Sequence, residues 1–179
     1  MPKPIKVKIY YDENLKAITG KDFEEAVVSE NLDFRMFLNY IFTSYPDIMK
    51  KFIPGTLGFG LNGESPKSDT ILNDGDELRL VGYTIKKVRE GVRKRVEEII
   101  GRYGVDLDFE TIERMIYEEK NKDDFDNLTN LFAEKISDMN ELNKTLQIVN
   151  AAWNCFPHKC LNGLCPMEKL AESQQKSKE

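Results

Sequence analysis

The stretch LNDGDELRLVGYTIKKVREG, residues 72–91, contains the turn and the strand that decide the fold. Its letters NDGD tolerate the backbone angles that a tight turn requires. After the turn, Leu78 and Leu80 alternate with polar residues, which predicts a half-buried strand. Beyond that strand the apolar residues recur at helical spacing. We therefore predict a change of structure at this point and two domains, residues 1–83 and 84–179.

The residues before this stretch predict a small α+β domain. Alternating apolar residues indicate strands, and a period near 3.6 between them indicates one amphipathic helix that Asn31 or Asp33 can cap. Phe23 and Val27 are expected to point inward from the second, weaker strand. One such helix can cover one face of a single mixed sheet. The strands are expected at 4–11, 22–28, 57–61 and 77–83, the main helix at 34–45 and a turn at 12–21.

A family resemblance rests on three segments: IKVKIYYDENLKAITGK, LGFGLNGE and TILNDGDELRLV. They resemble the ubiquitin-like β-grasp family of molybdopterin-synthase small subunits and thiamine sulfur carriers (MoaD/ThiS-like). The resemblance covers about the first 83 residues. It implies a ubiquitin-like β-grasp domain in this half of the chain.

The chemistry of that family requires a free carboxyl-terminal glycine, which becomes a thiocarboxylate. Its tail must thread a narrow channel in which a Cβ atom would clash. Here Gly82 stands alone and Tyr83 follows it, while the chain ends on SQQKSKE. We therefore expect a carrier-like fold without the diglycine tail.

The second half predicts four amphipathic helices, expected within 84–104, 105–120, 123–138 and 139–154. We interpret it as a small all-helical domain with a disordered tail from about residue 173. Its first helix is rich in basic residues, which could bind phosphate or acidic groups. The alternative is a solvated helix face that nearby glutamates neutralise. The basic residues are Lys86, Lys87, Arg89, Arg93, Lys94 and Arg95.

The stretch AAWNCFPHKCLNGLCPMEKL, residues 151–170, holds all three cysteines and the single histidine. Three thiols and one imidazole could form a tetrahedral zinc site. However, no C-x-x-C pair presents two thiolates together, so we expect no stoichiometric zinc. The alternative zinc ligands are Cys155, His158, Cys160 and Cys165.

The frame W-N-x-x-P-x-x-x-L-x-G-x-x-P-x-E in this stretch resembles a tail motif of uncharacterised bacterial proteins and of transposases. A structural role is expected for it, because proline stops a helix and glycine permits a turn. Trp153 is predicted to be a buried anchor on the same face as Leu142, Leu146 and Val149. The alternative is a partner-binding surface formed by Trp153, Asn154, Pro157, His158 and Gly163.

The composition argues against nucleic-acid and membrane functions. The net charge of −5 is opposite to the basic balance of most nucleic-acid binders. No apolar run approaches the length of about 18 residues that spans a membrane, and the amino terminus lacks the apolar core of a signal peptide. Three cysteines, an odd number, fit a reducing cytoplasm better than a disulfide scaffold.

Three function classes remain. The leading one is a non-catalytic protein-interaction module with a protein partner and no cofactor. With one histidine, no nucleophile elbow and no phosphate loop, no catalytic residues stand out and an enzyme is not expected. The alternatives are a sulfur carrier or accessory protein in molybdopterin or thiamine biosynthesis, and a nucleic-acid-associated protein that uses the basic helix.

Overall fold

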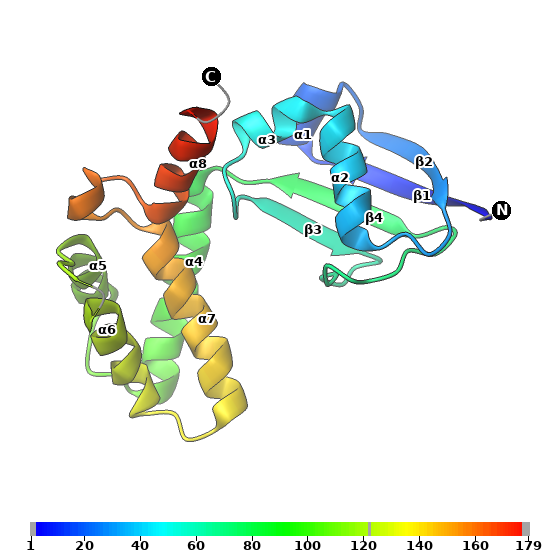
Figure 1. Ribbon diagram of the computed structural model, residues 1–179. Coiled ribbons are helices and arrows are strands. Elements are labelled where there is room, and N and C mark those ends of the chain that lie inside the picture. The colour runs from blue at the N-terminus through cyan, green and yellow to red at the C-terminus, as the bar shows by residue number, and fades with distance from the viewer. Residues whose placement is uncertain (1–2, 122, 177–179) are drawn as a thin grey trace. The chain divides into compact units, whose positions relative to one another are not determined.

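A computed structural model describes residues 3–121 and 123–176, which fold into two compact units (Figure 1). The units are Met1–Thr84 and Ile85–Glu179. The boundary predicted from the sequence, between residues 83 and 84, lies one residue earlier than this one. No helix among the described residues is long and apolar enough to cross a membrane.

The first unit is a mixed sheet with helices on one face, as Figure 1 shows for α2 (Phe34–Ser44). Its other elements are the helices α1 (Glu13–Thr19) and α3 (Pro46–Lys51) and the strands β1 (Pro4–Tyr11), β2 (Phe23–Ser29), β3 (Leu57–Leu61) and β4 (Glu77–Gly82). The strand order is β2-β1-β4-β3, in which the central strands β1 and β4 are parallel and both outer pairs are antiparallel. This order, with its main helix between the second and third strands, is the ubiquitin-like β-grasp. The prediction of an α+β fold is confirmed.

The core of the first unit lies between the sheet and these helices. Every second residue of β1 and β4 points into it, as the alternation predicts. Asp33 caps α2 by accepting a hydrogen bond from the Met36 amide at 2.8 Å. The core includes Ile5, Val7, Ile9, Leu78 and Leu80 from the sheet and Leu15, Phe34, Phe37, Ile41 and Ile48 from the helices.

Within residues 12–21, where a turn is expected, the structure has helix α1. Asp12 caps it by accepting a hydrogen bond from the Leu15 amide at 3.0 Å, and Gly20 ends it with a φ of +71°. Leu15 is its one fully buried residue. A helix of under two turns with a single buried position carries too little periodicity to be identified from its sequence.

The expected direction of the β2 side chains is wrong. Phe23 and Val27 are exposed, at 45% and 61%, while Ala26 is buried. The pairing register explains this, because Ala26 lies opposite the buried Val7 of β1. A shift of one residue would exchange the two faces of a strand, so the register decides which set points inward.

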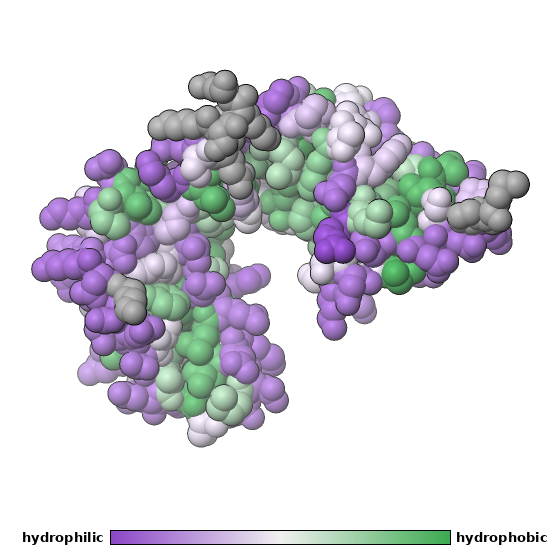
Figure 2. Space-filling view, viewed as in Figure 1, coloured by the Kyte–Doolittle hydropathy of each residue, from purple (hydrophilic) through white to green (hydrophobic). Residues whose placement is uncertain are grey.

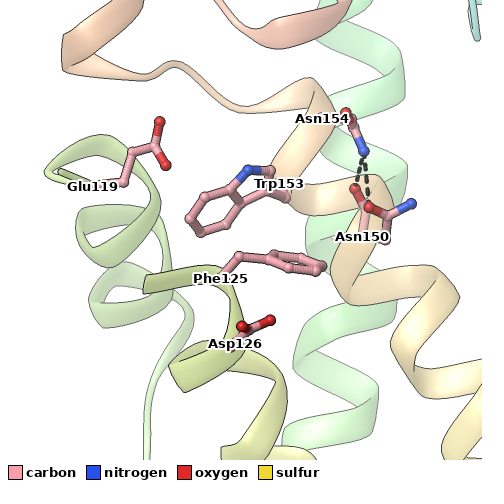
Figure 3. A pocket seen from close by; sticks show the side chains of 6 residues that line it. All are labelled: Glu119, Phe125, Asp126, Asn150, Trp153 and Asn154. Atoms are coloured by element: carbon pink, nitrogen blue, oxygen red, sulfur yellow. Dashed lines mark hydrogen bonds between the residues drawn. The ribbon is translucent and has the colours of Figure 1, made fainter. Parts of the chain in front are cut away.

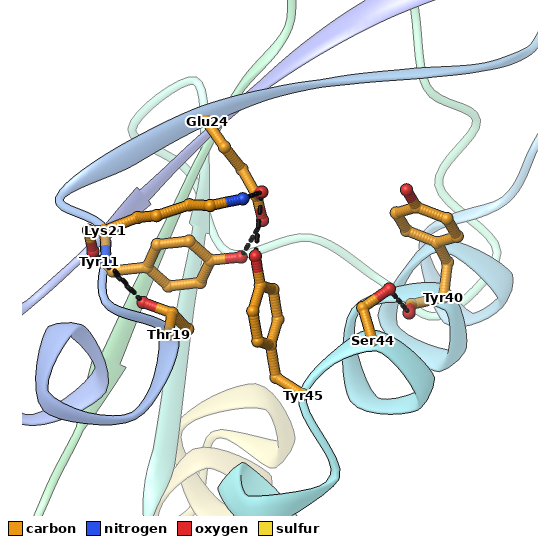
Figure 4. Close-up of polar contacts among 7 residues, drawn as sticks. All are labelled: Tyr11, Thr19, Lys21, Glu24, Tyr40, Ser44 and Tyr45. Atoms are coloured by element: carbon orange, nitrogen blue, oxygen red, sulfur yellow. Dashed lines mark hydrogen bonds and ion pairs between the residues drawn. The ribbon is translucent and has the colours of Figure 1, made fainter.

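The register also turns the carboxylate of Glu24 toward the helices, where it accepts three hydrogen bonds (Figure 4). The hydroxyls of Tyr11 and Tyr45 donate at 2.6 and 2.9 Å, and Lys21 donates at 2.5 Å. Burial raises the pKa of Glu24, but these hydrogen bonds outweigh it and hold the pKa below its usual value. Glu24 thereby links β2 to the end of β1 and to the residue that follows α2.

Replacing Glu24 with glutamine is expected to lower the free energy of unfolding by about 1–2 kcal/mol at pH 7, because hydrogen bonds to a charged group are lost. A carboxyl with a lowered folded pKa stabilises the fold above its unfolded pKa and loses that contribution as the pH falls. The difference from wild type should therefore shrink below about pH 4. Urea unfolding of the wild type and the variant at pH 7 and below about pH 4 measures this difference, with the exposed Glu25→Gln as control. Equal losses at both pH values would contradict the role of the charge.

The second unit is helical, as the sequence predicts. Asp108 caps α5 (Phe109–Tyr117) and Asp138 caps α7 (Met139–Cys155), each accepting a backbone hydrogen bond at 2.8 Å. Its core draws on α4 (Ile85–Tyr103), α5, α6 (Asp123–Ala133) and α7 and includes Val96, Ile99, Phe109, Ile112, Ile116, Leu128, Phe132, Val149 and Ala152. Its other elements are the 3-10 helix η1 (Lys159–Leu161) and α8 (Pro166–Lys176).

The expectation of a disordered tail from about residue 173 is wrong up to Lys176, because α8 continues to that residue. Pro166 at its start and Glu168 in its first turn favour helix formation there. The last three residues, 177–179, lie outside the described part of the chain.

Candidate functional site

Among the described residues of the first unit, no helix covers the second face of the β-grasp sheet. A row of residues crosses this face through all four strands, because Phe23 pairs with Tyr10, Tyr10 with Arg79 and Arg79 with Gly60. We call these four residues the aromatic row. The rings of Phe23 and Tyr10 lie 5.2 Å apart, and the Arg79 guanidinium lies 5.1 Å from the centre of the Tyr10 ring. The contacts order an aromatic and cationic surface on the uncovered face of the sheet.

The charges beside the aromatic row neutralise one another. Lys8 pairs with Glu77 at 3.2 Å, and Lys6 pairs with Glu25 at 2.8 Å. At the β3 end, a Cβ atom added to Gly60 would meet no atom within 4 Å. The row therefore ends in space that a side chain of another molecule can fill.

The end of β4 is packed into the first unit rather than released as a tail. The Gly82 carbonyl accepts a hydrogen bond from the side-chain amide of Asn14 at 2.9 Å. A Cβ atom at Gly82 would lie within 3.0 Å of three ring carbons of the buried Phe52. The close approach of the Phe52 ring therefore requires a residue without a Cβ atom at position 82, which is a structural reason for this glycine.

In the second unit, Trp153 lines an open groove of about 500 Å³ (Figure 3). Trp153 is half-buried rather than buried, and its ring meets Phe125 edge-on at 5.0 Å. In the space-filling view, an apolar stripe is visible over α7 among hydrophilic side chains (Figure 2). The groove residues are Glu119, Phe125, Asp126, Asn150, Trp153 and Asn154.

The structure divides the residues of the tail motif. Trp153 and Asn154 line the groove, and His158 is fully buried behind Trp153, with their rings 5.1 Å apart. Pro157 and Gly163 shape the loop, since Gly163 has a φ of +81° and its amide donates to the His158 carbonyl at 2.9 Å. These two residues hold the loop and are not part of the groove lining.

His158 forms a compact cluster with two side chains, Glu119 and Cys160. Its Nδ1 lies 3.1 Å from Oε1 of Glu119, and the Cys160 thiol donates to the same oxygen at 2.9 Å. That hydrogen bond and the carboxylate charge raise the pKa of the Cys160 thiol. Among the described residues, this is the one group of three or more His, Cys, Asp or Glu side chains whose ligand atoms could share a metal ion.

The other two cysteines do not belong to this cluster. Cys155 and Cys165 are fully buried. Burial raises the pKa of Cys155 to about 12 and also raises that of Cys165, so both thiols stay protonated at neutral pH. The alternative of a zinc site formed by all three cysteines and His158 is therefore not realised among the described residues.

The predicted basic patch is divided as well. Arg89 donates to Glu168 at 2.9 Å and to the Cys155 carbonyl at 2.6 Å, which fixes α8 and the end of α7 to α4. Arg93 pairs with Glu97 and Glu110 and covers the Phe109 ring at 4.8 Å. Both arginines thus serve the packing of the second unit. The remaining residues of the patch, Lys86, Lys87, Lys94 and Arg95, are exposed.

No protein-family model and no curated protein match the chain. Among solved structures, 45% of the chain is similar to a putative molybdopterin converting factor, subunit 1, from Pyrococcus furiosus (22% identity, 99% of that chain, TM-score 0.41). An equal share is similar to small archaeal modifier protein 1 from H. volcanii (15% identity, 99% of that chain, TM-score 0.41). A Caldiarchaeum subterraneum ubiquitin matches 46% (23% identity, 96% of that chain, TM-score 0.33).

These likenesses, all with TM-scores below 0.5, add nothing to the strand order and register on which the β-grasp assignment rests. The resemblance of residues 153–168 to a bacterial tail motif finds no support in them.

Two features of these sites were not predicted from the sequence. One is the place of Glu119 beside Cys160, from which it lies 41 residues away along the chain. The other is the aromatic row, because Phe23 was expected to point into the core. The alternating Lys6, Lys8 and Tyr10 of β1 were the one local indication of an exposed sheet face.

Proposed function

We propose that the protein is a non-catalytic binding module that recognises a protein partner through the uncovered face of its β-grasp sheet. The observation that carries the proposal is the aromatic row, which places Phe23, Tyr10 and Arg79 side by side on the uncovered face of the sheet. Aromatic residues and arginine are enriched in protein interfaces and dominate their binding energy. A large exposed phenylalanine on a sheet face has no role in the core of the domain.

The aromatic row is also ready to bind without rearrangement. Its residues sit on paired strands, and the Arg79–Tyr10 and Phe23–Tyr10 contacts hold the side chains in place before any partner arrives. Binding therefore requires little ordering of side chains, which preserves affinity.

A sulfur-carrier function is disfavoured by the packing of Gly82. Carrier chemistry needs a released glycine carboxylate, whereas this carbonyl is bonded to Asn14 and this α-carbon lies against Phe52. Cleavage after Gly82 would have to open the end of β4 first. The intact mass of the chain after co-expression with an activating enzyme should therefore stay unchanged.

Replacing Phe23 with serine is expected to weaken partner binding at least about 30-fold, the effect of losing about 2 kcal/mol at an interface hot spot. The fold should persist, because Phe23 is 45% exposed. Quantitative affinity capture from native extract, with the whole chain as bait, identifies partners whose recovery falls in the variant. Their purified forms then give the two dissociation constants.

The matched control is Met36→Ser on α2, since Met36 is 55% exposed and lies on the helical side of the same unit. It should leave the dissociation constant unchanged. If both variants bind equally well, the sheet face is not the recognition surface. A salt-titrated RNA-binding assay addresses the nucleic-acid alternative, in which phosphate contacts would give a steep dependence on salt.

A further inference from the structure

The His158 ring has one nitrogen engaged and one without a hydrogen-bond partner. Nε2 lies 2.7 Å from the Trp153 carbonyl, and because a carbonyl only accepts, Nε2 carries the proton. In the neutral ring, Nδ1 then presents its lone pair. Nδ1 is buried and makes no hydrogen bond, although Oε1 of Glu119 lies only 3.1 Å away.

This arrangement brings two electron-rich atoms together out of line for a hydrogen bond. A neutral Nδ1 and a carboxylate oxygen at 3.1 Å repel unless a cation lies between them. A third donor, Sγ of Cys160, lies 2.9 Å from the same oxygen.

The three donors fit the size of a zinc site. Bond lengths of about 2.0–2.3 Å place tetrahedral ligand atoms roughly 3.3–3.6 Å apart. The Nδ1, Oε1 and Sγ atoms all lie within 4.8 Å of one another. The distances from Oε1 to Nδ1 and to Sγ, 3.1 and 2.9 Å, would lengthen by about 0.2–0.7 Å around the ion. Imidazole, thiolate and carboxylate are all established zinc ligands.

The surroundings prepare the histidine for this role. Metal-bound histidines commonly donate their other N–H to a carbonyl, which fixes the tautomer, and the Trp153 carbonyl occupies that position. The His158 amide also donates to the Leu164 carbonyl at 2.9 Å, which ties the loop that carries Cys160. Cys160 is exposed, so the site is open to solvent on that side.

We infer that Glu119, His158 and Cys160 form a zinc site with three protein ligands and a fourth position open to water or an external ligand. On binding, the Cys160 thiol loses its proton to solvent and its sulfur forms the bond to zinc. The proposal departs from the sequence-based expectation of no zinc, because Glu119 replaces the two buried cysteines in the ligand set. It is independent of the sheet face proposed for partner binding.

The test titrates the full chain, freed of metal by a chelator, with Co²⁺ as a spectroscopic substitute for zinc. We expect one Co²⁺ per chain and a thiolate-to-metal charge-transfer band that added Zn²⁺ abolishes. Cys160→Ser should lose the band, and Glu119→Gln should keep it but bind more weakly, by more than the roughly 10–100-fold that loss of an outer-shell partner costs. Cys155→Ala, which retains the same number of thiols as Cys160→Ser, should behave as wild type.

Absence of the band in the wild-type chain, or its persistence in Cys160→Ser, would overturn the site. A measurement without any variant guards against misfolding of the mutants. Zn²⁺ should slow alkylation of the exposed Cys160 in the wild-type chain, as followed by peptide mass mapping. An unchanged alkylation rate at saturating Zn²⁺ would equally refute the proposal.

Discussion

Replacing Gly82 with alanine is expected to lower the free energy of unfolding of the first unit by about 3 kcal/mol, the upper range for overpacking a core. The added methyl would lie within 3.0 Å of three ring carbons of Phe52. That ring is only 6% exposed, so it cannot move aside into solvent. Relief would require shifting β4 or the chain after α3, either of which disturbs the packing of the sheet.

The matched control is Gly60→Ala on the neighbouring strand β3, where an added Cβ meets nothing within 4 Å. Chemical unfolding followed by circular dichroism should place it within about 0.5 kcal/mol of wild type, as for most surface substitutions. Phe52→Leu in the Gly82→Ala background should recover part of the loss, since the smaller side chain leaves room for the methyl. Similar stabilities for the two alanine variants would show that Gly82 is not set by packing.

The elements that could be predicted from the sequence are those whose own residues carry the pattern. Ile5, Val7 and Ile9 alternate without interruption, and Phe34, Phe37 and Ile41 repeat at helical spacing. Such segments leave little choice of which face is buried.

The face of β2 could not be predicted in the same way, because its residues FEEAVVS have apolar side chains on both faces. The choice is made by pairing with β1, where Ala26 meets Val7 and Glu24 meets Ile9. No local pattern contains that register. Its consequence is large, since it turns Glu24 toward two tyrosine hydroxyls and sends Phe23 to the exposed face.

The two candidate sites depend on contacts between distant parts of the sequence. The sheet face joins β1 to β4, whose residues Lys8 and Glu77 are 69 positions apart. The cluster around His158 joins a residue just after α5 to the loop after α7. Motif spacing identified His158 and Cys160 within one stretch, but their carboxylate partner is supplied by the tertiary fold.

Each unit has a hydrophobic core of its own, so damage to one need not unfold the other. Gly82→Ala should therefore reduce the hydrogen-exchange protection of β1 and β4 and spare α7. A destabilising variant in the second unit should instead reduce the hydrogen-exchange protection of α7 and spare β1 and β4.

Trp153→Ala is that variant, and it is expected to lower the free energy of unfolding of the second unit by about 3 kcal/mol. This is the lower end of the range for removing a buried aromatic side chain, because Trp153 is half-buried. Its ring contacts Phe125 at 5.0 Å and His158 at 5.1 Å, and such edge-on pairs add stability beyond the area they bury. Trp153→Phe should keep part of both contacts and lose clearly less.

Hydrogen exchange read by mass spectrometry measures the effect, because the variant lacks the single tryptophan and cannot be followed by its fluorescence. Amides of α6 and α7 should lose protection by about the same free energy, while those of β1 and β4 keep theirs. Met139→Ala, at a residue of α7 that is 66% exposed, is the control and should change neither set. If Trp153→Ala costs less than about 0.5 kcal/mol, as a surface substitution would, the indole is not an anchor of the fold. The groove that it lines would then be better explained as a surface for a partner.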